Sequence, residues 1–184
     1  DGQGNTVYFS ETIIIFTSNL GIYQTTASGE RKQVVSSDMS YEEVQSKVRE
    51  GIEHYFKLEL GRPEILNRIG ENIVVFDFIR ESVAGEILDS QINRIINNLK
   101  MDKGIKLVLS DQAHDTLLNA TIGNLDNGGR GIGNIVESMF INPLSRYMFD
   151  HELFSDCEIV VESIVNENMT YSLKCTETHG NNEE

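Results

Sequence analysis

The chain has 184 residues, of which 39% are apolar and 24% charged, enough for the core of one domain or of parts of two small ones. The formal net charge is −14, and no stripe of lysine or arginine offsets the 29 acidic residues, which argues against nucleic acid as a partner. No apolar run approaches the roughly 20 residues of a membrane helix and no secretory leader is visible, so we expect a cytoplasmic protein that does not bind membranes.

Two short apolar runs in the first half predict strands. Residues 12–17 form a continuous β-branched run, which is typical of strands buried on both faces of a parallel sheet. Residues 73–76 form a second run of the same kind. Together they predict part of an α/β sheet.

The residues between these two runs predict a loop followed by helices. The polar, irregular stretch from about residue 22 to residue 39 predicts a mobile surface loop. Ser40 and Glu43 then form a capping box for an amphipathic helix that Gly61 stops. Pro63 suits the first turn of a second, short helix.

The sequence after Phe78 is mostly helical in character, so we place a domain boundary there. The expected elements, in chain order, are an apolar helix over residues 83–99, a strand over 105–109, a helix capped by Ser110, a helix through Ile132 that Pro143 kinks or breaks near Asn142, and a hairpin of residues 158–164 and 169–175.

Cysteine and histidine usage points away from a metal site. Cys157 and Cys175 are too few for a disulfide framework and are expected to be reduced, the alternative being that they meet across the terminal hairpin. The four histidines lack metal-ligand spacing and form no cluster with either cysteine. We therefore predict no bound metal among these residue types.

Three motifs occur in a fixed order along the chain. They are residues 1–9 leading into Ile-Ile-Ile-Phe-Thr-Ser-Asn-Leu-Gly at 13–21, Arg-Pro-Glu-Ile-Leu-Asn-Arg-Ile at 62–69, and Gly-Gly-Arg-Gly-Ile at 128–132 leading into Asn-Pro-Leu-Ser at 142–145. In this order they resemble the sensor 1 strand, the arginine-finger box and the sensor 2 turn of AAA+ ATPases of the ClpB/ClpA type, from the C-terminal part of the ATPase module. The resemblance spans residues 1 to about 150, and the terminal hairpin fits the end of the family's small domain.

The resemblance implies a fold in two parts. Residues 1–78 would be the C-terminal part of a P-loop AAA+ large α/β domain, with an incomplete parallel sheet. Residues 79–176 would be the mostly helical AAA+ small (lid) domain with a terminal β-hairpin, followed by a disordered tail at 177–184. In the family's sheet order the strands at Ile13 and Val74 flank a central strand that this chain lacks, so we expect the second part to be the more stable.

The resemblance also implies a role for three residues. Asn19 would act as sensor 1 on the attacking water or the γ-phosphate, Arg68 as the arginine finger for a neighbouring subunit, and Arg130 as sensor 2 for the nucleotide of its own subunit. The local sequence alone leaves simpler roles open: a turn-forming asparagine, an arginine paired with Glu64 four residues earlier, and a loop arginine on an acidic surface. Arg62 is a weaker second candidate for the finger.

The implied parent is an ATP-driven protein unfoldase or remodelling enzyme that uses ATP and Mg²⁺ and assembles into a homo-oligomeric ring, expected to be a hexamer. Its partners would be protein substrates, with a peptidase or adaptor left open. No lysine here follows a glycine, so the Walker A loop is absent, and Phe78 follows Asp77 where a Walker B motif would have glutamate. Since the chain also lacks an initiator methionine, we expect a fragment that is inactive alone. The alternative is a non-catalytic AAA+-like scaffold for ring assembly or adaptor binding.

Overall fold

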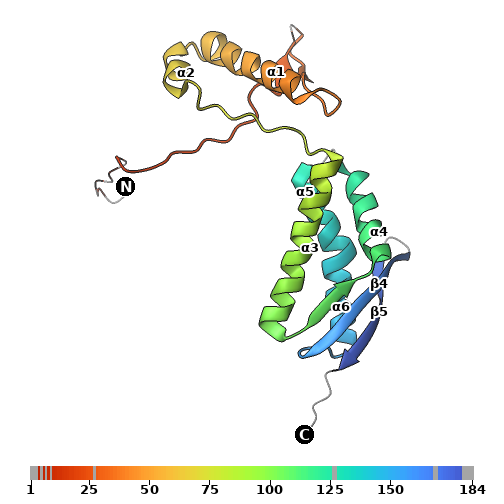
Figure 1. The fold of residues 1–184 in the computed structure, drawn as a ribbon. Helices are drawn as coiled ribbons and strands as arrows, with labels where there is room; N and C mark the ends of the chain where they lie inside the picture. Colours follow the sequence, from red (N-terminus) through yellow and green to blue (C-terminus); the bar gives the residue numbers. More distant parts are fainter. Residues whose placement is uncertain are drawn as a thin grey trace. The chain divides into compact units, whose positions relative to one another are not determined.

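The computed structural model describes residues 4, 6, 8, 10–26, 28–125, 128–167 and 170–179. The chain forms two compact units, residues 1–77 and residues 78–184. Figure 1 shows the helices α1 and α2 of the first unit, and the helices and sheet of the second.

The first unit is built on one helix. Helix α1 (Tyr41–His54) begins at the predicted capping box, in which the Ser40 hydroxyl accepts from the Glu43 amide at 3.3 Å and the Glu43 carboxylate accepts from the Ser40 amide at 2.9 Å. A π-helical segment, η1 (Tyr55–Glu59), continues it, and Pro63 begins the short helix α2 (Pro63–Ile69). Few apolar side chains are buried in this unit: Val35, Val44, Val48 and Val75.

The predicted surface loop over residues 22–39 contains a β-hairpin. Strand β1 (Tyr23–Thr25) pairs antiparallel with β2 (Arg31–Gln33), and all six strand residues are exposed. The amide of Thr26 donates to the carbonyl of Glu30 at 2.8 Å, and the Arg31 guanidinium lies 5.2 Å from the centre of the Tyr23 ring. Backbone pairing and a cation–π contact, rather than burial, therefore hold the hairpin.

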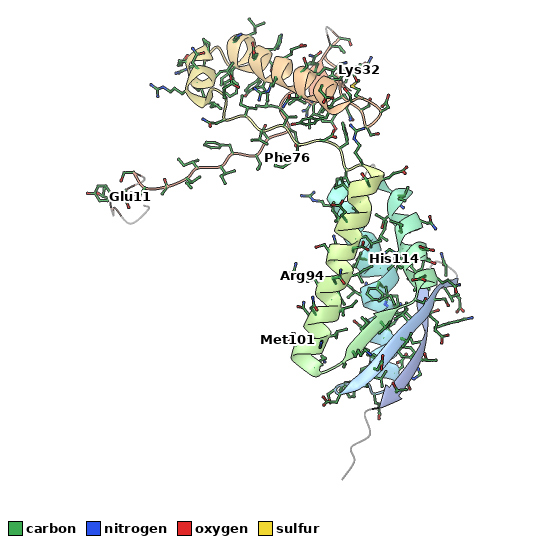
Figure 2. The ribbon with its side chains drawn as sticks, in the orientation of Figure 1. Glu11, Lys32, Phe76, Arg94, Met101 and His114 are labelled. Carbon is green, nitrogen blue, oxygen red and sulfur yellow. The ribbon has the colours of Figure 1, made fainter. Side chains whose placement is uncertain are left out.

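The two predicted buried strands of the first unit are wrong for this chain by itself. Residues 12–17 and 73–76 are not strands and join neither sheet of the described residues. The side chains of residues 13–16 are between 63% and 91% exposed, and Phe76 is 86% exposed (Figure 2). A strand needs a neighbouring strand for its backbone N–H and C=O groups, and no described strand pairs with either segment, so the incomplete parallel sheet does not form.

The second unit packs helices on a small sheet (Figure 1). The elements in chain order are α3 (Glu81–Lys103), β3 (Lys106–Leu109), α4 (Asp111–Ile122), α5 (Gly128–Val136), the π-helical segment η3 (Glu137–Ile141), α6 (Asn142–Asp150), β4 (Cys157–Glu167) and β5 (Thr170–His179). The strands lie in the order β3-β4-β5, with β3 parallel to β4 and β5 antiparallel to it.

One hydrophobic core holds this second unit together. Leu88 of α3, Leu117 of α4, Phe140 of η3 and Ile159 of β4 are all completely buried in a single cluster. Alternate residues of β4 point into this cluster, as expected for a strand with one covered face. The core thus joins each layer of the unit.

The predicted elements of the second unit are largely confirmed. The predicted strand is β3. The helical run does not break at Pro143, however, because the backbone stays helical through Ile141 and Asn142: the π-helical segment η3 leads directly into α6, and the Asn142 amide donates to the Glu137 carbonyl. Pro143 lies in the first turn of α6, where its missing N–H is tolerated. The hairpin is longer than predicted, however, and the disordered tail is wrong for residues 177–179, which belong to β5. Glu177 is held there because its carboxylate accepts a hydrogen bond from the Tyr147 hydroxyl at 2.9 Å. The rest of the predicted tail, 180–184, lies outside the described residues.

Both cysteines are free thiols, as predicted. Cys175 lies opposite Val161 in the hairpin register, four positions along β4 from Cys157, so the two do not meet across the hairpin. Burial raises the pKa of both thiols, that of Cys175 to about 12.

Candidate functional site

Asn19 lies in an exposed turn at the end of the extended segment. The Leu20 amide donates to the Ser18 hydroxyl at 3.0 Å, and the Ile22 amide donates to the Asn19 carbonyl at 3.4 Å. The next residue, Gly21, is buried against helix α1. The Asn19 side chain makes no hydrogen bond with the residues that the structure describes, so its amide is available to a ligand.

Arg68 lies in the last turn of α2 and is exposed. Its expected alternative partner, Glu64, instead pairs with Arg62 at 3.3 Å. Arg68 has no hydrogen bond or ion pair with any described residue. A local ion pair therefore occupies Arg62 and leaves the guanidinium of Arg68 uncommitted.

A polar hollow of about 320 Å³ lies between α1, η1 and α2. It is lined by Arg49, Glu53, Lys57, Leu66, Asn67, Gly70, Glu71 and Ile73. Its cations already have anionic partners: Lys57 lies 2.7 Å from Glu53 and lowers the pKa of that carboxyl, mainly through the hydrogen bond, and Arg49 lies 3.9 Å from Glu71. Because the charges balance, this hollow is not suited to a polyphosphate.

Arg130 lies in the first turn of α5, in the second unit. The helix buries its opposite face through Gly131, Ile132, Ile135 and Val136. Arg130 is exposed and makes no hydrogen bond or ion pair with a described residue. The first turn of a helix directs its backbone N–H groups outward, and beside an exposed guanidinium such a turn suits an anion such as phosphate.

The predicted site residues divide between the two units. Asn19 and Arg68 belong to the first unit, and both are near helix α1. Gly21, two residues after Asn19, packs against α1, and helix α2, which carries Arg68, packs against η1 at the end of α1. Arg130 belongs to the second unit.

Two side chains of α1 that were not predicted as site residues attach the segment after α2 to this helix. The Tyr41 hydroxyl donates to the Val75 carbonyl at 3.2 Å, and Arg49 donates to the Ile73 carbonyl at 3.0 Å. Their partners lie 34 and 24 residues further along the chain. Local periodicity carries no signal for such contacts.

The described residues offer neither a cluster of metal ligands nor a membrane-spanning helix. No group of three or more His, Cys, Asp or Glu side chains there could hold a metal ion. None of the described helices is long and apolar enough to span a membrane.

The helices and three-stranded sheet of the second unit suit a small lid-like domain of the AAA+ type, and the comparison with known families assigns it to that class. Residues 79–161 match the family described as the C-terminal, D2-small domain of ClpB protein. The chain is also 34% identical over 160 residues to the chaperone protein ClpB of Rhizobium meliloti, covering 87% of this chain and 17% of the relative. It is 30% identical over 167 residues to ClpB of Gloeobacter violaceus, covering 91% of this chain and 17% of the relative.

A third relative, ClpB of Agrobacterium fabrum, is 39% identical over 119 residues, which are 65% of this chain and 12% of the relative. These matches confirm the resemblance predicted from the three motifs: the chain is of the ClpB type of AAA+ protein, from its C-terminal part, and carries a D2-small domain. It spans under a fifth of the length of these relatives.

Proposed function

We propose that this chain is the nucleotide-sensing C-terminal part of an ATP-driven protein-remodelling enzyme. In the assembled parent, Asn19 orients the attacking water or contacts the γ-phosphate, and Arg130 contacts the nucleotide of the same subunit. Arg68 neutralises charge on the γ-phosphate bound by the next subunit of a homo-oligomeric ring. The observation that carries the proposal is the uncommitted guanidinium of Arg68, within a box that resembles the family's arginine-finger motif.

The donor chemistry of the chain fits a triphosphate. Arg68 and Arg130 are exposed cations without protein partners among the described residues, in a chain whose net charge is −14. Cations left unpaired against so strong an acidic excess are suited to binding an external anion. Bound ATP with Mg²⁺ supplies the phosphoryl group that is transferred to water, and the main phosphate cradle belongs to polypeptide that precedes this chain in the parent.

The exposed apolar segments of the first unit support the same proposal. Residues 13–16 and Phe76 expose large apolar side chains, which is costly in water unless another segment covers them. In the parent, a central strand from the preceding polypeptide pairs with both segments and completes the sheet. Asn19 then lies at the carboxyl edge of that sheet, where open α/β sheets bind their ligands.

The parent works in the cytoplasm on protein substrates, and its ring is a hexamer. Nucleotide-dependent rotation of the second unit transmits the energy of hydrolysis to the substrate. A peptidase or an adaptor remains an open partner. If the preceding polypeptide lacks the Gly-Lys-Ser/Thr loop and the Asp-Glu pair, the chain instead serves a non-catalytic scaffold for ring assembly.

The test is an ATPase assay of the full-length parent in mixed rings of Arg68→Ala and Asn19→Ala subunits, each expected to be nearly inactive by itself. A finger that acts on the neighbouring subunit predicts that mixing restores part of the activity, because a site with Asn19 from an Arg68→Ala subunit and Arg68 from an Asn19→Ala neighbour is intact. Loss of such a finger costs about 10³- to 10⁵-fold in well-studied nucleotide hydrolases. The matched control is Arg94→Ala, an exposed arginine on α3, which should leave activity unchanged. No recovery of activity on mixing would contradict the proposed role, because an arginine that acts within its own subunit leaves every site with one defect.

A further inference from the structure

The turn that follows Asn19 lies directly on helix α1 through two glycines. Gly21 is buried with φ +82°, and a Cβ placed on it would lie 2.9 Å from Cα of Val48 and closer still to the Val48 carbonyl oxygen. A Cβ placed on Gly51, one helical turn further along α1, would lie 2.6 Å from Cα of Gly21. Real Cβ atoms essentially never approach other heavy atoms this closely. The atoms in the way belong to backbone, which cannot rotate aside as a flexible side chain can, so the contact requires glycine at both positions.

Little else holds this turn in the described structure. Residues 13–16, which lead into it, are exposed, and Asn19 itself is exposed. The local hydrogen bonds are the 3.0 Å bond from the Leu20 amide to Ser18 and the long 3.4 Å bond from the Ile22 amide. The Ile22 carbonyl also accepts from the Val34 amide at 3.0 Å, which joins the turn to the end of the β1–β2 hairpin. The contact of Gly21 with Val48 and Gly51 is what sets the turn against helix α1.

Glycine is a poor choice for the body of a helix unless its lack of a side chain is needed. Gly51 is the eleventh residue of the 14-residue α1, well inside the helix. Alanine is favoured over glycine at such positions, because glycine loses more conformational freedom when the helix forms. The close approach of Gly21 gives a physical reason for glycine at this position.

We propose that Gly51 is a positioning residue for Asn19, a role that rests on the sensor function proposed above. Asn19 is only two residues from Gly21, so a methyl group at position 51 displaces the turn and the Asn19 amide with it. The displacement needed is a large fraction of an ångström, and misplacement of a reacting group by about 1 Å can cost about 10²-fold in rate. Gly51→Ala should therefore impair catalysis although its own side chain touches no nucleotide.

The experiment measures ATP hydrolysis by rings of the full-length parent. We expect Gly51→Ala to lower kcat about 10- to 100-fold with little change in KM. In an Asn19→Ala background the same substitution should have almost no further effect on kcat, because the group that it displaces is already absent. The matched control is Gly85→Ala in α3, where the nearest atom to the added methyl is a Leu118 side-chain carbon at an ordinary 3.6 Å, and kcat should not change.

The outcomes separate this inference from the proposed function. If Asn19→Ala leaves kcat unchanged, the sensor function fails. If Asn19→Ala lowers kcat and Gly51→Ala does not, or if the two effects simply multiply, only the positioning role is overturned. If Gly51→Ala rings do not assemble, amide hydrogen exchange of the full-length variant decides between the outcomes. Faster exchange at residues 20–22, with exchange at residues 44–48 of α1 unchanged, supports the positioning role. Loss of protection throughout α1 overturns it.

Discussion

Phe140 is the largest completely buried side chain of the chain's described residues, and it lies where the π-helical segment η3 faces the core of the second unit. Phe140→Ala removes the buried ring and leaves a cavity lined by helices and sheet that share one core. Substitutions of this kind cost about 3–5 kcal/mol. Since domains of this size are stable by only about 5–15 kcal/mol, the variant loses a large fraction of its stability.

The matched control is Phe149→Ala in α6, nine residues later, because the Phe149 side chain is 72% exposed. Removing an exposed ring should change the free energy of unfolding by no more than about 0.5 kcal/mol. The assay is urea unfolding of residues 78–184, followed by circular dichroism. The isolated unit is suitable because the hydrophobic core lies entirely within it. We expect a lower midpoint for Phe140→Ala at an unchanged slope.

In a thermal scan, each kcal/mol of lost unfolding free energy lowers Tm by about 4–8 °C for a domain of about 100 residues. Phe140→Ala should therefore lower Tm by at least roughly 12 °C. A loss below about 1 kcal/mol for Phe140→Ala, or equal losses for both variants, would refute the core assignment. The comparison uses the same residue type twice, so only burial differs between the two sites.

Two further predictions concern the first unit and the terminal hairpin. In the isolated 184-residue chain, the amides of residues 12–17 should exchange with solvent far faster than those of residues 132–140, because the former lack strand partners; equal protection would contradict this. Burial, with the charges of Glu162 and Glu177, raises the pKa of Cys175 to about 12. The folded chain therefore keeps a proton that the unfolded chain loses, and stability should fall as pH rises from about 9 towards 12. Cys175→Ala should weaken this dependence in urea titrations at several pH values, and an unaltered dependence would speak against it.

The sequence by itself determined the elements whose signals are local. The Ser40 capping box, the Pro63 start of α2 and the terminal hairpin depend on residues within a few positions of one another, and each is observed. The three motifs also predicted the ClpB/ClpA type of AAA+ protein, since their order along the chain is itself a sequence property, and the family match agrees. The roles of Asn19, Arg68 and Arg130 stay predictions.

The tertiary structure decided what depends on partners distant in sequence. The apolar run at residues 12–17 has the composition of a buried strand, but no described strand pairs with it and residues 13–16 stay exposed. The pairing of Glu64 with Arg62 rather than with Arg68 was equally open, because both arginines lie within reach of that carboxylate along the sequence. The approach of Gly21 to Gly51 has no local signature, since 30 residues separate two glycines that pack backbone against backbone. Strand pairing and close packing are set by what lies alongside a segment in space, which residue spacing alone does not record.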